Sequence, residues 1–468
     1  MAQTIDVTQF IDRQPVSRFL VGVVLLCTLV TLADGFNISL VAFAAPAIVK
    51  EWHLNRAALG PLLSSSLVAG LIGPFLFGLL GDRIGRRNAM IGATVMIGVF
   101  GILSGLCTSF IQLIAVRFFA GIAMSGALAV TVAAINEFAP RRLRATFVTI
   151  AFSGTTIGSG LPGLFAAPLL VHYGWQALFM VGGVAPLILA VAVYMLLPES
   201  PKFLCLHPEK RAQLVEVLRR ADPNLNAEPD CQYVLAGESQ SARSSFGQLF
   251  AGSLSRLTPL LWLGSFLVML VFYSFNSWLV QLLSDEGLAY GRATLALTLF
   301  QFVGTLGGWI IARPLDKFGM IPCTVLYVLS VPVIASMGLP GNSETTLLLL
   351  TAAAGFCVLG LHFAQVSAIS NIYPTPVRAL GIGWFMIFAR AGGAIGPLIV
   401  SVLVGRHVPL RSLFYYASIP LAVGTVASVA VTLIYRTHYH VRRAATDGND
   451  NRAEDPGQQV RRAKGVTG

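Results

Sequence analysis

Charged residues are scarce in this sequence. Asp, Glu, Lys and Arg make up 11% of its 468 residues, against about 25% in soluble domains, and 55% of the residues are hydrophobic. This shortage excludes an ordinary soluble protein. Twelve predominantly apolar stretches are instead long enough to cross a bilayer as helices. They lie at residues 19–41, 57–80, 88–108, 111–136, 146–172, 177–197, 256–283, 293–313, 320–339, 345–369, 379–404 and 412–435.

Other features are missing altogether. The six cysteines form no CxxC pair and four of them fall inside apolar stretches, so neither a disulfide framework nor a zinc site is expected. No GxxxxGK[ST] sequence is present, which argues against nucleotide binding. The first apolar stretch lacks a basic leader and a small-residue cleavage site, so we interpret it as a retained helix. No metal or organic cofactor is predicted.

The net charge of +11 follows membrane topology. If both termini are inside the cell, 25 of the 32 Lys and Arg residues fall in inner loops and tails. That asymmetry is the positive-inside rule, so the basic charge does not indicate nucleic-acid binding. The sequence therefore predicts a multi-pass protein of the cell membrane, by expectation a bacterial inner membrane, with N- and C-termini in the cytoplasm.

The chain contains an internal repeat. Asp82 in "GDRIGRR" and Asp316 in "RPLDKFG" are 234 residues apart, half the chain length, and the same offset relates Pro140 to Pro374 and Arg144 to Arg378. We therefore expect an all-α membrane protein with two pseudo-symmetric six-helix bundles. The predicted segments are a cytoplasmic N-terminal segment (1–18), an N-terminal bundle (19–197), a cytoplasmic central loop (198–255), a C-terminal bundle (256–435) and a charged cytoplasmic tail without apolar periodicity, predicted disordered (436–468).

Several of these stretches resemble a known family. "GDRIGRRN", "RFFAGIAMSGALAVTVAAINEFAPRRLRA" and "LPESPKFL" are similar to the inner loop between helices 2 and 3, to helix 4 with the loop after it, and to the exit from helix 6 of the major facilitator superfamily. "DGFN", "YPTPVRALGIGW" and "ARAGGAIGP" resemble the aromatic acid:proton symporters within it. Asn37 stands where that group usually has a second acid in its first helix.

The resemblance implies the major facilitator fold and a secondary transporter, not an enzyme. The expected activity is uptake of a small aromatic, hydroxybenzoate-like carboxylate with protons by alternating access, with the proton gradient as the energy source. The expected partners are the organic anion, protons and the lipid bilayer, and we expect a monomer. Alternatives are an importer of a non-aromatic organic acid, a proton-driven efflux antiporter, an intramembrane acyltransferase with His362 as base, or a receptor without transport activity.

Ionisable residues inside spans are the main functional candidates, because each costs about 2.5–3.5 kcal/mol on insertion scales. Asp34 and Arg117 are expected at similar depth on neighbouring helices, and we predict that they form the proton-coupling pair. Asn37 lies one helical turn beyond Asp34 and cannot titrate, so it is interpreted as a hydrogen-bonding residue of the cavity or as an interhelical contact.

Arg390 is expected near the membrane midplane, beside small residues. Its planar fork of donors suits a carboxylate, which makes it the predicted binder of the anionic substrate. His362 and Gln365 are expected at similar depth, in a substrate role, a proton role or as interhelical hydrogen-bonders. The remaining predicted substrate-binding residues are Tyr273, Asn276, Gln301 and Trp384.

Charges at the inner ends of the spans form a separate group. Salt bridges there can bias one of two conformations, so these residues are predicted to gate the transporter rather than to bind the ligand. They are Asp82, Arg83, Arg86, Glu137 and Arg144 in the first half, with Asp316 and Arg378 as weaker counterparts in the second. Topology charge without a gating role is the alternative.

Overall fold

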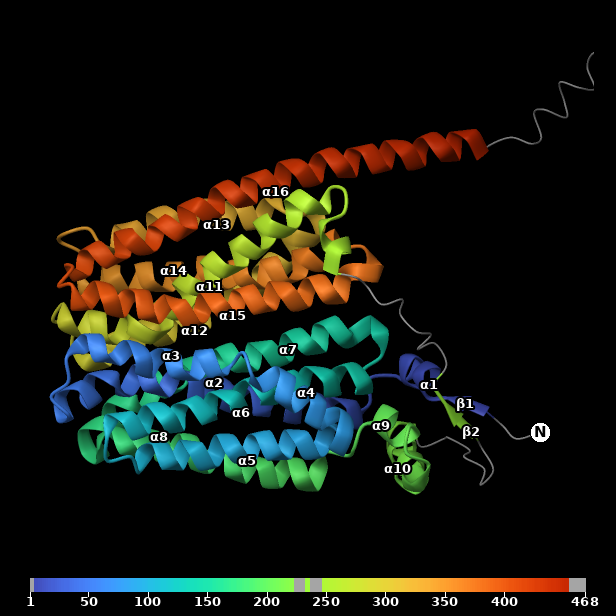
Figure 1. The fold of residues 1–468 in the computed structure, drawn as a ribbon, viewed down its shortest axis with the longest axis horizontal. Helices are drawn as coiled ribbons and strands as arrows, with labels where there is room; N and C mark the ends of the chain where they lie inside the picture. The colour runs from blue at the N-terminus through green and yellow to red at the C-terminus, as the bar shows by residue number, and fades with distance from the viewer. Residues whose placement is uncertain (1–3, 223–231, 236–245, 454–468) are drawn as a thin grey trace, which may run out of the picture.

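The computed structural model describes residues 4–222, 232–235 and 246–453; the side chains of residues 312, 316, 370, 371, 375, 376, 379 and 436–453 lie outside the described set. Long helices dominate it, and they run roughly parallel to one axis (Figure 1).

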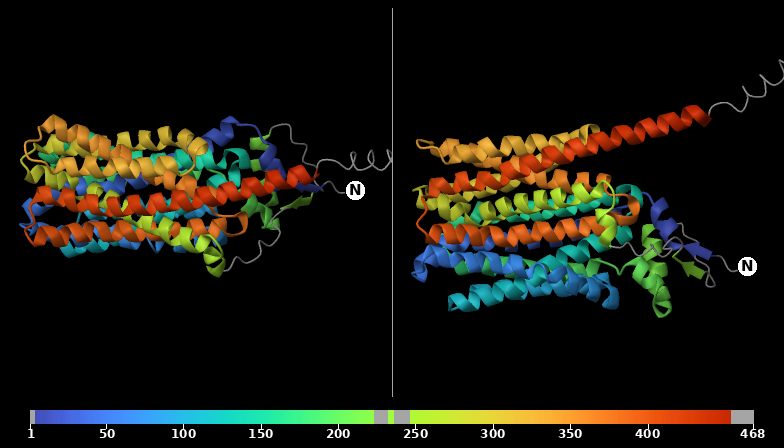
Figure 2. Two further views of the ribbon diagram at one scale, coloured as in Figure 1. Left: turned by 90° about the horizontal axis from the view of Figure 1, so that it is seen from above. Right: turned by 45° about the horizontal axis from the view of Figure 1, so that its top comes forward.

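The helices form two groups that lie side by side, one from each half of the chain (Figures 1 and 2). The first half contains α2 (Arg18–Glu51), η1 (Arg56–Ala58), α3 (Leu59–Ala69), α4 (Gly73–Ile84), α5 (Arg86–Gly105), α6 (Phe110–Phe138), α7 (Arg141–Gly160) and α8 (Pro162–Leu196). The second half contains α11 (Leu254–Asp285), α12 (Tyr290–Phe318), α13 (Ile321–Met337), α14 (Glu344–Ile372), α15 (Thr375–Gly405) and α16 (Leu410–Ala453).

The twelve predicted crossings are recovered within the described residues. Ten helical stretches are long and apolar enough to span a membrane. One of these, Arg141–Leu196, has 56 residues and holds two crossings, because the chain turns at Gly174, whose φ of 74° favours glycine. The twelfth crossing is α13, which has 17 residues.

The repeat is confirmed in the helix boundaries. An offset of 234 residues maps both ends of α6 onto the ends of α14. The same hydrogen bond also recurs in the two halves: Arg144 Nε donates to the carbonyl of Ala139 at 3.0 Å, and Arg378 Nε donates to the carbonyl of Tyr373 at 3.2 Å. The two halves therefore share one architecture.

The two ends of the molecule differ. The end that carries the N-terminus, called the near end below, also holds a small cap outside the long helices (Figure 1). In this cap β1 (Thr4–Asp6) pairs in parallel with β2 (Gln232–Val234) beside α1 (Val7–Arg13), α9 (Pro201–Cys205) and α10 (Arg211–Ala221). The opposite end, called the far end, has only short connections between helices. At the near end α16 continues past the predicted span to Ala453, and residues 454–468 lie outside the described residues.

Contacts between the halves position the functional site. α2 packs on α11, α3 on α15, and α7 and α8 on α12. A cavity remains between the halves, lined by residues of both.

Candidate functional site

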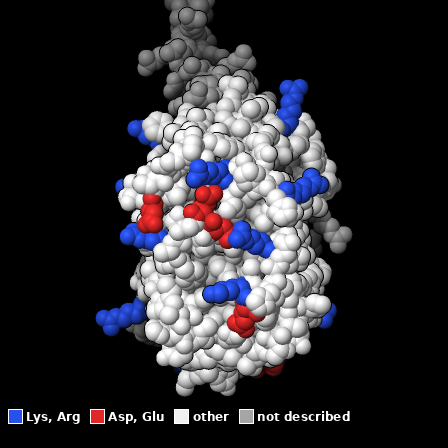
Figure 3. Space-filling view, turned by 90° about the vertical axis from the view of Figure 1, so that its left-hand side faces the viewer, with Lys and Arg blue, Asp and Glu red and all other residues white. Residues whose placement is uncertain are grey.

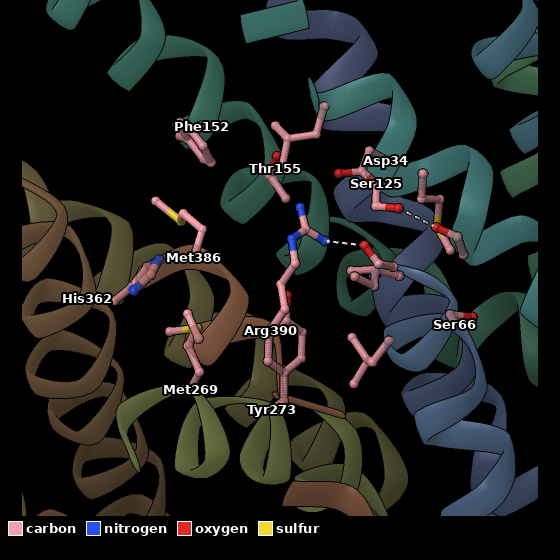
Figure 4. A pocket seen from close by; sticks show the side chains of 17 residues that line it. Asp34, Ser66, Ser125, Phe152, Thr155, Met269, Tyr273, His362, Met386 and Arg390 are labelled. Atoms are coloured by element: carbon pink, nitrogen blue, oxygen red, sulfur yellow. Dashed lines mark hydrogen bonds between the residues drawn. The ribbon is translucent and has the colours of Figure 1, made fainter. Parts of the chain in front are cut away.

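A cavity of about 120 Å³ lies between the two halves. Figure 4 shows side chains from both halves converging on it. The first half lines it with Asp34, Ile38, Ser66, Leu67, Gly70, Gly121, Met124, Ser125, Leu128, Phe152 and Thr155, and the second half with Met269, Tyr273, His362, Met386, Ala389 and Arg390. Asp34 and Arg390 face a mainly apolar space, and His362 lines the same space.

Asp34 and Arg390 lie halfway along their helices, α2 and α15. Nη1 of Arg390 donates to the carbonyl of Gly70 at 3.2 Å and so crosses from the second half to the first. Asp34 is 3% exposed, and among the described residues it forms no ion pair within 4.0 Å. Arg390 is the charged side chain that acts on it electrostatically.

Arg117 does not meet the Asp34 carboxylate, although the sequence predicts that the two pair. The expected depth of Asp34 rested on a first span that ended near residue 41, whereas α2 continues past Pro46 to Glu51. Asp34 therefore lies at the middle of its helix, while Arg117 lies close to the far-end start of α6. Nη2 of Arg117 donates instead to the carbonyl of Asn37 at 2.8 Å, and its guanidinium lies over the Phe179 ring.

Asn37 forms an interhelical contact, which is one of the two roles that the sequence analysis gave it. Its amide nitrogen donates to the carbonyl of Ala33 at 3.1 Å and to that of Gly182, on α8, at 2.7 Å. It is 1% exposed and does not line the cavity. Asn37 thus fastens α2 to α8.

The predicted substrate-binding residues divide into two groups. Arg390, His362 and Tyr273 line the cavity. Gln365 does not: its amide donates to the hydroxyl of Tyr327 at 3.0 Å, inside the second half.

Asn276 and Gln301 lie outside the cavity lining, in a buried polar cluster. Nε2 of Gln301 and Oγ of Ser39 both donate to Oδ1 of Asn276. This cluster joins α2 to α11 and α12, so it connects the two halves. Trp384 stacks on Trp262 with ring centroids 5.8 Å apart, and neither ring lines the cavity.

Three of the predicted gating residues meet at the near end of the first half. Nη2 of Arg86 lies 2.7 Å from Asp82 Oδ1, and its Nε lies 3.0 Å from Glu137 Oε1. Because these residues come from α4, α5 and α6, the cluster ties three helices together. Glu199, which the sequence analysis did not single out, adds to this region by accepting the backbone N–H of Arg87 at 3.1 Å.

The other predicted gating residues are arranged differently. Arg144 lies 3.6 Å from Asp12 on α1, and Arg83 is exposed. Asp316 lies in α12 with its side chain outside the described set. At the position equivalent to Arg86 the second half has Met320, so the arginine of the cluster is not repeated there.

At the far end, hydrogen bonds and an ion pair join the halves. Nη2 of Arg56 lies 3.0 Å from Asp285 Oδ1, Ser401 donates to the carbonyl of Ala57 at 2.5 Å, and Tyr290 donates to the carbonyl of Phe43 at 2.6 Å. Figure 3 looks onto this end, where basic and acidic side chains lie next to one another on a mostly uncharged face. These contacts hold the far ends of the two halves together.

The sequence analysis missed several residues of the cavity wall, mainly Ser66, Ser125, Phe152, Thr155 and Met269. Small and apolar residues of these types are common in every span, so only their meeting in space distinguishes them. Among the described residues, no group of three or more His, Cys, Asp or Glu side chains is placed to hold a metal ion.

Comparisons with known proteins agree with this architecture. A sequence model of the Major Facilitator Superfamily matches residues 27–341 and 261–464. The chain is 32% identical over 435 residues to the 4-hydroxybenzoate transporter PcaK of Pseudomonas putida, which covers 93% of this chain and 97% of the relative. It is 31% identical over 430 residues to the gallate transporter of Pseudomonas putida, over 91% of this chain and 95% of the relative.

Solved structures show the same fold. The inward open conformation of the xylose transporter XylE from E. coli matches with a TM-score of 0.67 at 18% identity, over 88% of this chain and 95% of that one. A bacterial homolog to the human lysosomal transporter Spinster, inward-facing and unoccupied, matches with a TM-score of 0.65 at 16% identity, over 90% of this chain and 97% of that one.

Proposed function

This chain belongs to the Major Facilitator Superfamily, in the group that includes the 4-hydroxybenzoate and gallate transporters, and from that premise we propose that it takes up a small aromatic carboxylate together with protons. The observation that carries the proposal is the cavity between the halves, where Arg390 and Asp34 are the two oppositely charged residues of the wall.

Arg390 is the proposed receptor for the substrate carboxylate. A guanidinium has five N–H donors in a plane and binds a carboxylate through two parallel hydrogen bonds. The bond from Arg390 to the carbonyl of Gly70 uses one of these donors. Because Arg390 contacts the first half from the second, an anion bound to it would also influence how the halves approach each other.

Asp34 is the proposed proton carrier. The Arg390 guanidinium attracts the Asp34 carboxylate. A substrate carboxylate at Arg390 would take over that positive charge, and two neighbouring carboxylates cannot both stay ionised at low cost in a buried site. Substrate binding therefore favours protonation of Asp34, which couples one proton to one anion. The exchange needs a single titratable acid.

The energetics favour this stoichiometry. An anion that enters against an inside-negative potential costs about 2.3 kcal/mol per 100 mV. One accompanying proton makes the step electrically neutral and draws on the pH gradient. The chain has no phosphate-binding loop of the ATPase type, so the proton gradient is the proposed energy source.

Alternating access is the proposed mechanism, with the far end facing outward and the termini in the cytoplasm of a bacterial cell. The contacts of Arg56, Tyr290 and Ser401 support a far end that is closed in this conformation. The cluster around Arg86 is the proposed latch at the near end. Both halves of one chain line the cavity, and we propose that one copy of the chain is the transporting unit.

The test is uptake of radiolabelled 4-hydroxybenzoate into proteoliposomes with an acidic exterior. We expect accumulation that rises as the outside pH falls and that collapses when a protonophore is added. Arg390→Lys should weaken substrate binding by about 10- to 100-fold, because the planar fork is lost. Arg406→Lys, at an exposed far-end position, is the matched control and should behave as wild type.

Two outcomes would contradict the proposal. If no benzoate of a panel were taken up or competed for uptake, small aromatic carboxylates would not be the substrates. If Arg390→Lys bound the substrate with wild-type affinity, Arg390 would not be the carboxylate receptor, and the proposal of transport itself would stand.

A further inference from the structure

The coupling scheme uses neither His362 nor Tyr273, the two other titratable side chains of the cavity wall. His362 lies on α14, and its Nδ1 is buried with no hydrogen-bond partner among the described residues. A buried polar atom without a partner is costly, and such atoms in native proteins call for an explanation. The ring itself lines the cavity, so a ligand there can exchange a hydrogen bond with the imidazole.

The internal repeat shows that packing does not require a histidine at this place. The offset that maps α6 onto α14 pairs His362 with Leu128. Leu128 lines the same cavity from the first half. The equivalent position holds a leucine, so the polar ring of His362 departs from the repeat. Asp34 and Arg390 depart from it as well, because their equivalent positions hold Val268 and Thr156.

The space between His362 and Arg390 suits an aromatic ring. Met386 and Met269 also line the cavity, and Figure 4 draws them on the side of the guanidinium that faces His362, with Asp34 on the other side. Methionine sulfurs make favourable contacts with aromatic rings. A cavity of about 120 Å³ is comparable to an engineered cavity of about 150 Å³ that takes up benzene.

We infer that His362 binds a hydroxyl group on the substrate ring, on the side opposite to the carboxylate, and so selects ring-hydroxylated aromatic acids. This inference rests on the proposed function, because it takes Arg390 as the carboxylate site. An imidazole nitrogen that faces the cavity accepts the phenolic O–H in one tautomer and donates to the phenolic oxygen in the other. An acid that lacks the hydroxyl leaves this nitrogen unpartnered, which is how a buried polar group rejects an analogue.

The experiment compares three acids on the purified full-length protein: 4-hydroxybenzoate, 4-methylbenzoate, which has nearly the same shape without the hydroxyl, and 3-hydroxybenzoate. Binding is measured by calorimetry in detergent and transport by counterflow in proteoliposomes. The wild type should bind 4-hydroxybenzoate on the order of tenfold more tightly than either of the other two.

Two variants separate hydrogen bonding from packing. His362→Leu, which copies Leu128, should lower the affinity for 4-hydroxybenzoate to that for 4-methylbenzoate and leave the latter unchanged within about twofold. His362→Gln places an amide close to the position of the outer ring nitrogen and should keep most of the preference. The binding of 4-methylbenzoate reports that each variant is folded.

Equal affinities of the wild type for 4-hydroxybenzoate and 4-methylbenzoate would overturn the inference. An equal loss for all three acids in His362→Leu would also overturn it, since the histidine would then act on the site as a whole. Failure of the proposed function is distinguishable, because in that case none of the three acids binds to the wild type.

Discussion

Asp34 and Arg390 illustrate how intramembrane charges derive their properties from their neighbours. Neither forms a close ion pair among the described residues, yet both line one cavity, and the guanidinium reaches a carbonyl of the opposite half. Such an arrangement keeps the positive charge accessible to a second carboxylate. The buried Arg117 contrasts with it, because its hydrogen bond to the Asn37 carbonyl holds it within the first half.

Asp34→Asn should abolish accumulation driven by a pH gradient while leaving exchange of labelled substrate measurable. The amide cannot take up a proton, but Arg390 can still hold the anion. Wild-type protein should take up about one proton for each substrate bound, so affinity falls as pH rises, and the variant should lose this linkage. Both effects are measured with a pH indicator and by counterflow.

Glu209→Gln is the control for this substitution, because that carboxyl is exposed at the near end. It should show wild-type accumulation and proton uptake. If Asp34→Asn kept the wild-type accumulation ratio, Asp34 would not lie on the proton path.

At the scale of helices, close approach between α2 and α7 brings Asp34 into the cavity wall. A Cβ added at Gly35 would lie 1.8 Å from the carbonyl oxygen of Thr155. The hydroxyl of Ser159, one turn further along α7, donates to the carbonyl of Gly35 at 3.0 Å. Small residues at such contacts are typical of membrane helix pairs, and here they place Asp34 and Thr155 around the same space.

Gly35→Ala should force the two helices apart. Overpacking of this kind costs about 1–3 kcal/mol, so we expect a lower unfolding temperature in detergent together with weaker substrate binding.

Gly22→Ala is the matched control on the same helix, because a Cβ there meets no atom within 4 Å. Alanine is the better helix former by about 1 kcal/mol, so this variant should be at least as stable as the wild type. Equal unfolding temperatures for the two variants would contradict the close-approach argument.

At the scale of the whole molecule, the two halves meet at the far end and in the middle. Thr305 donates to Thr156 at 2.7 Å and Trp309 to Ser153 at 2.8 Å, between α12 and α7, while Arg56 and Asp285 pair at the far end. Rocking of one half on the other about the cavity would have to break the far-end contacts.

A disulfide between Ala57→Cys and Gly405→Cys should therefore stop transport. A Cβ at Gly405 would lie 3.1 Å from that of Ala57, near the span of about 3.5–4.5 Å that a disulfide requires. Oxidation should block uptake, and reduction should restore it. The variants that carry only one of the two substitutions serve as controls and should be insensitive to oxidant. Unimpaired uptake by the cross-linked protein would show that the far end need not open.

The sequence predicted the fold and part of the site. The twelve crossings and the repeat are confirmed, because span length and a fixed offset are local properties that can be read along the chain. Arg390, His362 and Tyr273 were selected as polar residues inside spans, and the structure brings all three to one cavity. Asn276 and Gln301 met the same criterion yet contact each other elsewhere, since polarity within a span does not specify which neighbour a side chain faces.

The sequence by itself thus determined how many times the chain crosses, where it repeats, how its charge is distributed and which few charges lie within the membrane. Only the tertiary structure decided that Asp34 lies with Arg390 and not with Arg117. The physical reason is twofold: α2 continues through Pro46 to Glu51, which moves Asp34 to the middle of its helix, and the two residues come from opposite halves, whose packing alone brings them to one cavity.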